Sequence, residues 1–347
     1  MFNDQHRCDV RNHTTMNHHK RQSLHHLSAL GIMFATWPQA SANTPSRVIV
    51  PFNRGGISSH VADALGKELT KLGKHNWVTD HIPGYSNMSA VHSMIKAGDK
   101  GQWDIMIAGP TLLTTGNSMS PFTSINVDRD IRALTGLIQG PMILISHVKS
   151  DLNHWRTIEL SKRRLRVGVS GLGSASHFVA AHMDHSGLPL GDAYNTEGDQ
   201  RSMQRLAKGE LDLAVISIGS CLPPVNKDYN ALLTSGSQPM AWRDNITIPT
   251  MASAGQTPEA RAFHFYSWLA VCVSAKMPPA MQQAITESIQ HIKNAGGLTA
   301  VANTTYHQVM HSAPSALLQQ IHQSRALLEQ YILSAKLANT LGLELTR

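Results

Sequence analysis

The sequence predicts an α/β protein made of two lobes, each with a mainly parallel sheet flanked by helices. The first observation is that, from Arg47 onward, short apolar runs alternate with segments whose apolar residues recur at helical spacing. The second is a strand, glycine loop and helix that occur twice in the same order. The third is the length of 347 residues, which suits about two domains. A ligand cleft is expected between the lobes.

The first lobe is predicted to contain a βαβαβ unit. Val48–Val50 is a short β-branched run, which favours a strand. The helix after it is indicated by apolar residues at helical spacing between Val61 and Leu72. The unit is completed by a strand, a helix and a strand at Trp77–Ile82, Met88–Ala97 and Asp104–Ala108.

The second lobe is predicted to repeat this plan. Leu165–Ser170 has the composition of a strand, and Ser176–His185 that of a helix. Further strands are expected near Ala193 and at Leu211–Ser217. Because a helix begins after the first strand of each unit, two helix N-termini are expected beside a cleft between the lobes.

Two apolar segments are expected to connect the lobes. Ile131–His147 is too long and too interrupted by glycine to form one strand, so we expect it to cross from the first lobe to the second. Ser267–Ala275 is expected to cross back. Helices predicted at Pro279–Asn294 and Ala313–Ala335 then pack on the first lobe.

The N-terminal residues have the pattern of a secretory signal peptide. Lys20 and Arg21 precede an apolar stretch at Leu27–Trp37, and the small residues Ala40 and Ala42 form a cleavage pattern. We therefore expect cleavage after about Ala42 and a mature protein in the periplasm. The predicted divisions are a signal peptide at 1–42, the first part of lobe 1 at 43–145, lobe 2 at 146–266, and the return to lobe 1 with the C-terminal helices at 267–347.

Composition and spacing argue against several classes of function. The net charge is +7, but Lys and Arg are scattered and aromatic residues make up only 5%, so no nucleic-acid partner is expected. No stretch reaches the roughly 18 apolar residues of a membrane-spanning helix. His177, His182 and His185 do not share one helical face, so no metal site is predicted, and no cofactor is expected. Cys221 and Cys272 are either buried free thiols or a disulfide.

The first candidate binding loop follows the first predicted strand. Its adjacent glycines allow a tight turn that exposes backbone N–H groups, and Ser58 or Ser59 is expected to cap the next helix. Free N–H groups at a helix N-terminus attract anions, and the Arg54 guanidinium can pair with a carboxylate. An ordinary turn that binds nothing is the alternative. The candidate ligand-binding residues are Phe52, Asn53, Arg54, Gly55, Gly56, Ile57 and Ser58.

A second candidate loop follows the strand at 165–170. Backbone amides and serine hydroxyls there can hold a carboxylate. A serine hydrolase is the alternative, because two serines adjoin a histidine. Gly168–Leu172 begins like a nucleophile elbow, but Leu172 stands where the second glycine is required, so we predict binding and not catalysis. The candidate residues are Gly173, Ser174, Ala175, Ser176 and His177.

Three further sites lie after predicted strands, where α/β sheets bind ligands. Glu197 favours an amine or a hydroxyl over a plain anion, and Asp199 is interpreted as a helix cap. The candidate ligand-binding residues are Pro110, Thr111, Thr196, Glu197 and Ser217.

Four motifs agree in order with those of one receptor family. Val50–Gly56 is similar to a VPFPPGG strand end, and Gly171–His177 matches a GxGSxxH loop. Lys208–Leu213 is similar to GGxVDL, and Ser267–Ala270 to SWxGL. By these motifs the chain resembles the Bug-type (TctC-like) solute-binding receptors of tripartite tricarboxylate transporters. The resemblance implies the two-lobed periplasmic-binding-protein fold, with a carboxylate held largely by amides, hydroxyls and water.

The resemblance also implies a function. The receptor would capture a di- or tricarboxylate, or an aromatic acid, by hinge closure and deliver it to a membrane permease; service to a sensor kinase is the alternative. We expect a monomer that is not an enzyme, with hinges near Gly140 and Val271. Asn53 and Arg54 replace the family's proline pair and Ser59 replaces an acidic residue, changes that favour an anionic ligand.

Overall fold

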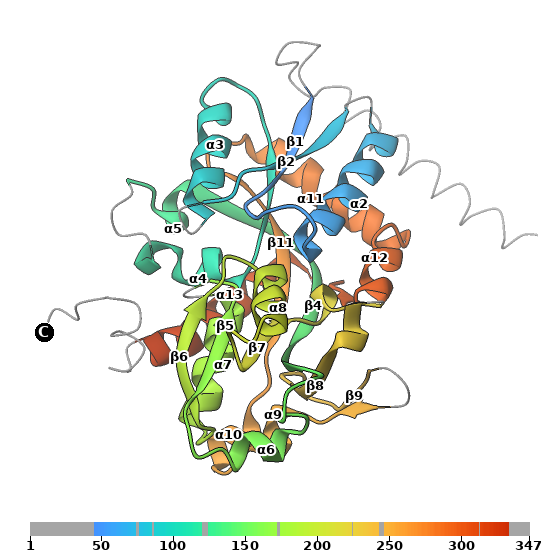
Figure 1. Cartoon of the computed structure of the whole chain (residues 1–347). Helices are drawn as coiled ribbons and strands as arrows, with labels where there is room; N and C mark the ends of the chain where they lie inside the picture. The colour runs from blue at the N-terminus through green and yellow to red at the C-terminus, as the bar shows by residue number, and fades with distance from the viewer. Residues whose placement is uncertain are drawn as a thin grey trace, which may run out of the picture.

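One long strand joins two sheets and so connects two lobes (Figure 1). The computed structural model describes residues 45–73, 76–84, 87–119, 124–171, 174–223, 225–242, 246–311 and 313–332. The predicted signal peptide and Gly173 lie outside these residues. The strand order is β2 (Trp77–His81), β1 (Ser46–Val50), β3 (Ile105–Ala108), β11 (Tyr266–Ser274), β4 (Ile131–His147), β7 (Leu213–Ser217), β5 (Leu165–Val169) and β6 (Leu190–Asn195).

The first lobe has the predicted βαβαβ plan. β1 pairs in parallel with both β2 and β3. Helices α2 (Ile57–Leu72) and α3 (Met88–Gly98) connect these strands. Side chains of β1 alternate, so that Val48 and Val50 join the core under α2 while Ile49 joins the core under α3. The two helices therefore cover opposite faces of the sheet.

The second lobe repeats this arrangement. β5 pairs in parallel with both β6 and β7. Helices α7 (Ala175–His185) and α8 (Asp199–Ala207) follow β5 and β6. Side chains of β7 alternate in turn: Val215 joins the core under α7, and Ala214 and Ile216 join the core under α8. The expected duplication of the strand, loop and helix plan is confirmed.

The connecting strand β4 contradicts the prediction that its segment is not one strand. Its 17 residues pair with β11 up to Pro141 and with β7 from Met142 onward. β4 continues through Gly136 and Gly140 without interruption. At both positions a side chain from elsewhere in the chain fills the space that a Cβ would need. A Cβ on Gly136 would lie 2.6 Å from Met310, and a Cβ on Gly140 would lie 2.5 Å from His307.

The return to the first lobe takes place at Phe265, and the strand after it agrees closely with the crossing predicted at Ser267–Ala275. The Phe265 N–H donates to the Ser235 carbonyl at 2.7 Å, and the next residue begins β11. β11 then lies between β3 and β4. Val271, near which one hinge is predicted, lies in the middle of β11 with a partner strand on each side. Gly140, near which the other hinge is predicted, lies beside the point where β4 changes its partner from β11 to β7.

The remaining elements complete both lobes. The C-terminal helices pack on the first lobe as predicted, α11 against α2 and α13 against α4. The helices are α4 (Pro110–Met119), α5 (Val127–Asp130), α6 (Trp155–Glu159), α9 (Met251–Ala254), α10 (Pro258–Ala262), α11 (Pro279–Asn294), α12 (Thr299–Thr304), α13 (Pro314–Ile332), η2 (Ile218–Ser220) and η3 (Val225–Asp228). The strands are β8 (Tyr229–Thr234), β9 (Met240–Ala241), β10 (Thr247–Ile248) and β12 (Gln308–Val309).

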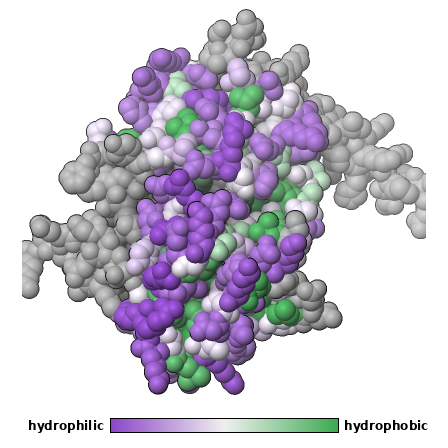
Figure 2. Space-filling model, in the orientation of Figure 1, coloured by the Kyte–Doolittle hydropathy of each residue, from purple (hydrophilic) through white to green (hydrophobic). Residues whose placement is uncertain are grey.

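The surface and the cysteines fit a folded two-lobed protein. Figure 2 shows a face that is mostly hydrophilic, with hydrophobic residues in small separate groups. Within the described ranges, no helix has the length and apolar character needed to cross a membrane. Cys221 and Cys272 are both buried and form no disulfide, which decides between the two alternatives in favour of thiols.

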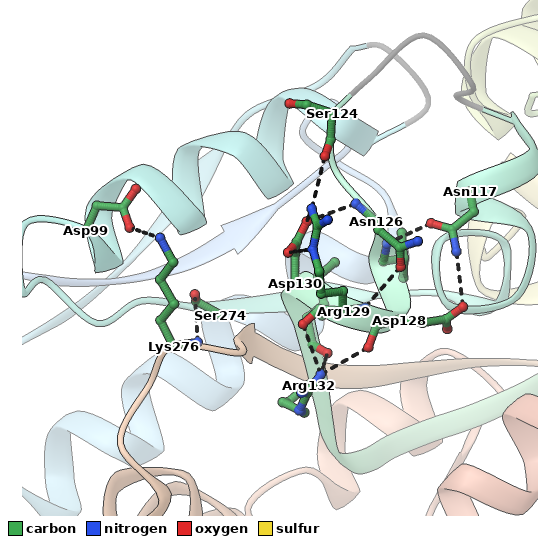
Figure 3. Close-up of polar contacts among 12 residues, drawn as sticks. Asp99, Asn117, Ser124, Asn126, Asp128, Arg129, Asp130, Arg132, Ser274 and Lys276 are labelled. Carbon is green, nitrogen blue, oxygen red and sulfur yellow. Dashed lines mark hydrogen bonds and ion pairs between the residues drawn. The ribbon is translucent and has the colours of Figure 1, made fainter.

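A polar network fixes the point at which β4 begins (Figure 3). Asn126 caps the short helix α5, because its side chain accepts the Arg129 N–H at 3.0 Å. Asn117 of α4 accepts the first N–H of the same helix at 2.7 Å. Arg132, the second residue of β4, donates to the Arg129 carbonyl at 3.3 Å. Helices α4 and α5 therefore hold the start of the strand that joins the lobes.

Each lobe ties its first and third strands together with a matching ion pair. Arg47 of β1 donates to Asp104 from Nη2 at 2.7 Å and from its backbone N–H at 3.0 Å. Arg166 of β5 makes the same two contacts with Asp212, at 3.1 and 2.8 Å. Each aspartate directly precedes the third strand of its lobe. The ion pairs therefore lie at the opposite strand ends from the candidate binding loops.

We predict that Asp104→Ala lowers the free energy of unfolding by about 3–5 kcal/mol, because the Asp104 side chain is fully buried and Arg47 would lose its main partner. Asp99→Ala is the control. It removes an exposed ion pair with Lys276 and should cost less than about 1 kcal/mol. Urea unfolding measures both variants, and equal costs would contradict this account of the strand pair.

Candidate functional site

The candidate loops gather at one edge of each sheet. β1 and β3 are neighbours in parallel, so the loops that follow them are adjacent in the first lobe. β6, β5 and β7 are likewise neighbours, so the loops that follow them are adjacent in the second lobe. Five sequence-predicted loops thus form two groups, one on each lobe.

The first loop presents an uncapped helix N-terminus. α2 begins at Ile57, and its N-cap is Gly56, which supplies no side-chain cap. The prediction that Ser58 or Ser59 caps this helix is wrong, because both serines lie inside its first turn and are buried. The first N–H groups of a helix have no partner within it, and the first turn of α2 holds no acidic residue. An anion is therefore favoured beside Gly56 and Ile57.

The rest of the first loop is open to solvent. Gly55 has φ +91°, a left-handed conformation that favours glycine. Asn53 and Arg54 are exposed, and the ring of Phe52 is 40% exposed. His81 lies 3.1 Å by its Nδ1 from the Phe52 carbonyl, which ties the loop to β2. Arg54 is therefore an exposed residue shortly before the start of α2, on a loop with a fixed base.

The loop after β3 starts helix α4 next to the first loop. Pro110 is the first residue of α4 and is buried. Its carbonyl accepts the Thr114 hydroxyl at 2.7 Å. Thr111 is half-buried in the first turn. The first lobe therefore presents two helix N-termini from neighbouring strands.

The second loop is a cluster of three serine hydroxyls. Ser174 is the N-cap of α7 and accepts the His177 N–H at 3.2 Å. Its Oγ lies 2.8 Å from the Oγ of Ser176, and Ser176 lies 2.8 Å from the Oγ of Ser170. Ser176 is fully buried, and Ala175 is half-buried. Of these hydroxyls, Ser174 and Ser170 are the ones with partial exposure, and Ser176 organises them from beneath.

His177 is a buried histidine. It is 2% exposed, and burial lowers the pKa of its imidazole to about 4. The ring is therefore neutral at pH 7 and contributes no charge toward a carboxylate. A general base works best with a pKa near the operating pH, so this histidine is poorly suited to activate Ser174 in a hydrolase.

The loop after β6 is closed by its own contacts. Thr196 is 3% exposed, and its Oγ1 lies 2.9 Å from the Val169 carbonyl and 2.6 Å from the Ser202 hydroxyl. Its side chain ties the end of β5 to α8. Glu197 is exposed and forms an ion pair with Arg201 on α8. The Glu197 carboxylate is thus paired with a cation of its own loop.

Asp199 is a site residue that the sequence analysis interpreted only as a helix cap. The N-cap of α8 is Gly198 instead. The Asp199 Oδ2 accepts the Ser217 N–H at 3.0 Å and the Ser220 hydroxyl at 2.7 Å. Its Oδ1 is buried, and the Ser170 hydroxyl is a further hydrogen-bonding neighbour of this carboxylate. Burial raises the pKa of this carboxyl above its usual range. The sequence held a signal for this contact, because Asp199 is an acidic residue at the start of a predicted helix, at the same sheet edge as Ser217.

No cluster of metal-binding side chains occurs within the described ranges. His182 instead stacks on Phe263, with ring centroids 3.6 Å apart. The arrangement at both sheet edges offers amides, hydroxyls and the Arg54 guanidinium. These groups bind small anions by hydrogen bonding and need no cofactor for it.

Comparison with known proteins shows the fold. No family model matches the chain, and no curated protein is significantly similar in sequence. Rpa4515 of R. palustris, solved with adipate, is 18% identical with a TM-score of 0.72, over 87% of this chain and 98% of that chain. MatC of Rhodopseudomonas palustris, solved with malate, is 17% identical with a TM-score of 0.69, over 84% and 100%.

A third structure of this kind is the periplasmic binding protein BugD. It is 18% identical with a TM-score of 0.67, over 88% of this chain and 99% of that chain. The chain therefore has the two-lobed fold of periplasmic solute-binding proteins. The solved structures that it resembles include a TctC solute binding protein from Polaromonas and BugD.

We predict that the protein loses stability as the pH falls from about 6.5 to about 4. His177 and His182 are buried and have pKa values lowered to about 4, so the unfolded chain binds more protons in this window. Each histidine contributes about 1–2 kcal/mol of this loss at pH 5. Urea unfolding at pH 7 and pH 5 measures it. His177→Gln should reduce the difference by the share that belongs to His177, about 1–2 kcal/mol, and an unchanged difference would contradict the assignment.

Proposed function

We propose that this chain is an extracytoplasmic solute-binding protein that captures a small organic carboxylate between its lobes and delivers it to the permease of a tripartite tricarboxylate transporter. The observation that carries the proposal is the uncapped N-terminus of α2, which has no acid in its first turn and lies beside the exposed Arg54. The binding of adipate by Rpa4515 and of malate by MatC supports a dicarboxylate as the ligand.

In this proposal each lobe holds one end of the ligand. The first lobe supplies the amides of Gly56, Ile57 and Ser58 and the guanidinium of Arg54, with Phe52, Asn53, Gly55, Pro110 and Thr111 around them. The second lobe supplies Ser174, with Ala175 beside it. Because Ser176, His177, Thr196 and Ser217 are buried and Glu197 is paired, these five support the second loop group and do not contact the ligand directly.

Closure of the two lobes is the mechanism, and no bond is made or broken. The bending points are β4 near Gly140 and the return at Phe265, because these are the backbone crossings between the sheets that the described residues contain. A buried, weakly basic His177 supports a receptor without enzymatic activity. We propose that the protein acts as a monomer in the periplasm after cleavage near Ala42.

Ligand-induced stabilisation tests the proposal. A dicarboxylate such as adipate or malate, at about a hundred times its dissociation constant, should add about 2.7 kcal/mol to the free energy of unfolding. The thermal midpoint should rise by several degrees. Arg54→Ala should reduce this shift, while Arg156→Ala, which removes an arginine on α6 in the second lobe, should not. If no dicarboxylate, tricarboxylate or aromatic acid shifts the midpoint, the receptor proposal fails.

Gly56→Ala should change the affinity for the ligand with little change in the stability of the fold. A Cβ at Gly56 would meet nothing within 4 Å, and its φ of −87° suits any residue. The midpoint without ligand should therefore change by only about a degree or two. The methyl group occupies the space beside the α2 amides, so carboxylate affinity should fall by about tenfold or more. Unchanged affinity would show that the anion is not bound at this helix.

A further inference from the structure

His307 is a buried imidazole at the junction of the lobes. It lies between α12 and β12, and it is 7% exposed. Its Nδ1 is 2.6 Å from the Thr305 carbonyl, a distance at which the ring N–H donates to the oxygen. Tyr306, the residue before His307, has a left-handed backbone conformation with φ +56°. β12 pairs with β4 opposite Gln139, which anchors the turn on the first lobe.

The His307 ring contacts one glycine on each side of the junction. A Cβ on Gly140 of β4 would lie 2.5 Å from the ring Cδ2. A Cβ on Gly219 of η2 would lie 3.1 Å from the ring Cε1. Gly219 belongs to the second lobe, because its neighbour Ile218 is part of the core under α8. The imidazole therefore fills the space between the shared strand and a turn of the second lobe.

The η2 turn, which contacts His307 through Gly219, is also connected to the candidate site. Ser217, which directly precedes η2, and Ser220, its last residue, both donate to the carboxylate of Asp199. Asp199 is the first residue of α8, at the sheet edge that carries the second group of loops. One short turn thus contacts the candidate site through Asp199 and the lobe junction through His307.

We propose that His307 is a positioning residue that sets the angle between the lobes, acting through Gly140 and Gly219. Packed interiors resist compression, so a rigid ring between two backbone segments limits how far they can approach each other. Its removal leaves a space into which the η2 turn can move, and the lobes then occupy a wider range of angles. The effect on the lobe angle is independent of the ligand; the effect on affinity rests on the proposed function.

The experiment measures the distance between the lobes by paired spin labels without ligand. The labels are placed on the mature protein, from Asn43 onward, by Lys67→Cys on α2 and Lys208→Cys after α8, both at exposed positions. Cys221 and Cys272 are buried, so labelling favours the introduced thiols. His307→Ala should widen the distance distribution by about twofold.

His182→Ala is the matched control, because it also removes a buried histidine. His182 stacks on Phe263 in the second-lobe core and does not fill the space beside Gly140 or Gly219. This variant should lose stability and keep the distance distribution of the parent protein. A residue with a merely structural role would behave like His182.

Combining Gly140→Ala with His307→Ala tests the contact between the two residues. The effect of Gly140→Ala on the width of the distance distribution should reverse between the two backgrounds, which general destabilisation does not produce. Gly140→Ala alone should widen the distribution, because its methyl group collides with the ring. In the His307→Ala background the same methyl group enters the vacated space, so the double variant should have a narrower distribution than either single variant. Gly219→Ala is a second route to displacing the ring, should His307→Ala fail to fold.

The outcomes distinguish this inference from the proposed function. Unchanged distributions in His307→Ala and Gly219→Ala, or a double variant wider than both singles, overturn the role of His307. With adipate or malate as the probe, His307→Ala should weaken binding by about tenfold while His182→Ala does not. Failure of the parent protein to bind either probe counts against the proposed function and leaves the lobe-angle result standing as support for His307.

Discussion

The backbone pairing of β4 is the constraint on which the two-lobed structure depends. One strand forms hydrogen bonds with β11 in the first lobe and with β7 in the second, so neither sheet is complete without it. Because β4 is continuous, any change in the angle between the lobes has to bend this strand. β4 carries glycine at positions 136 and 140, because Met310 and His307 occupy the space that a larger residue would need there.

The duplication of the lobes explains where a ligand can bind. Arg47 with Asp104, and Arg166 with Asp212, fix the first and third strands at one end of each sheet. The opposite ends are left to the loops, and each loop begins a helix. The two lobes differ in what they present there: free amides and Arg54 in the first, and a cluster of hydroxyls around Asp199 in the second. In the proposed receptor, the two ends of one ligand would therefore be bound by different groups.

Much of the fold could be predicted from local sequence, and the errors share one cause. The strands and helices of both units were predictable because each carries its own apolar pattern. The continuity of β4 and the contact of Asp199 with Ser217 depend on residues far away in the chain. Local propensity carries no information on them. The candidate loops were predictable as loops, whereas the burial of Ser176 and His177 was not, because it depends on packing against the second-lobe core.

The central claim is that the two lobes close around a carboxylate. Small-angle X-ray scattering of the mature protein, with and without saturating adipate or malate, tests this claim directly. The account predicts a smaller radius of gyration with the bound ligand, together with a narrower pair-distance distribution. An unchanged radius of gyration at a ligand concentration that calorimetry shows to be saturating would contradict closure between the lobes.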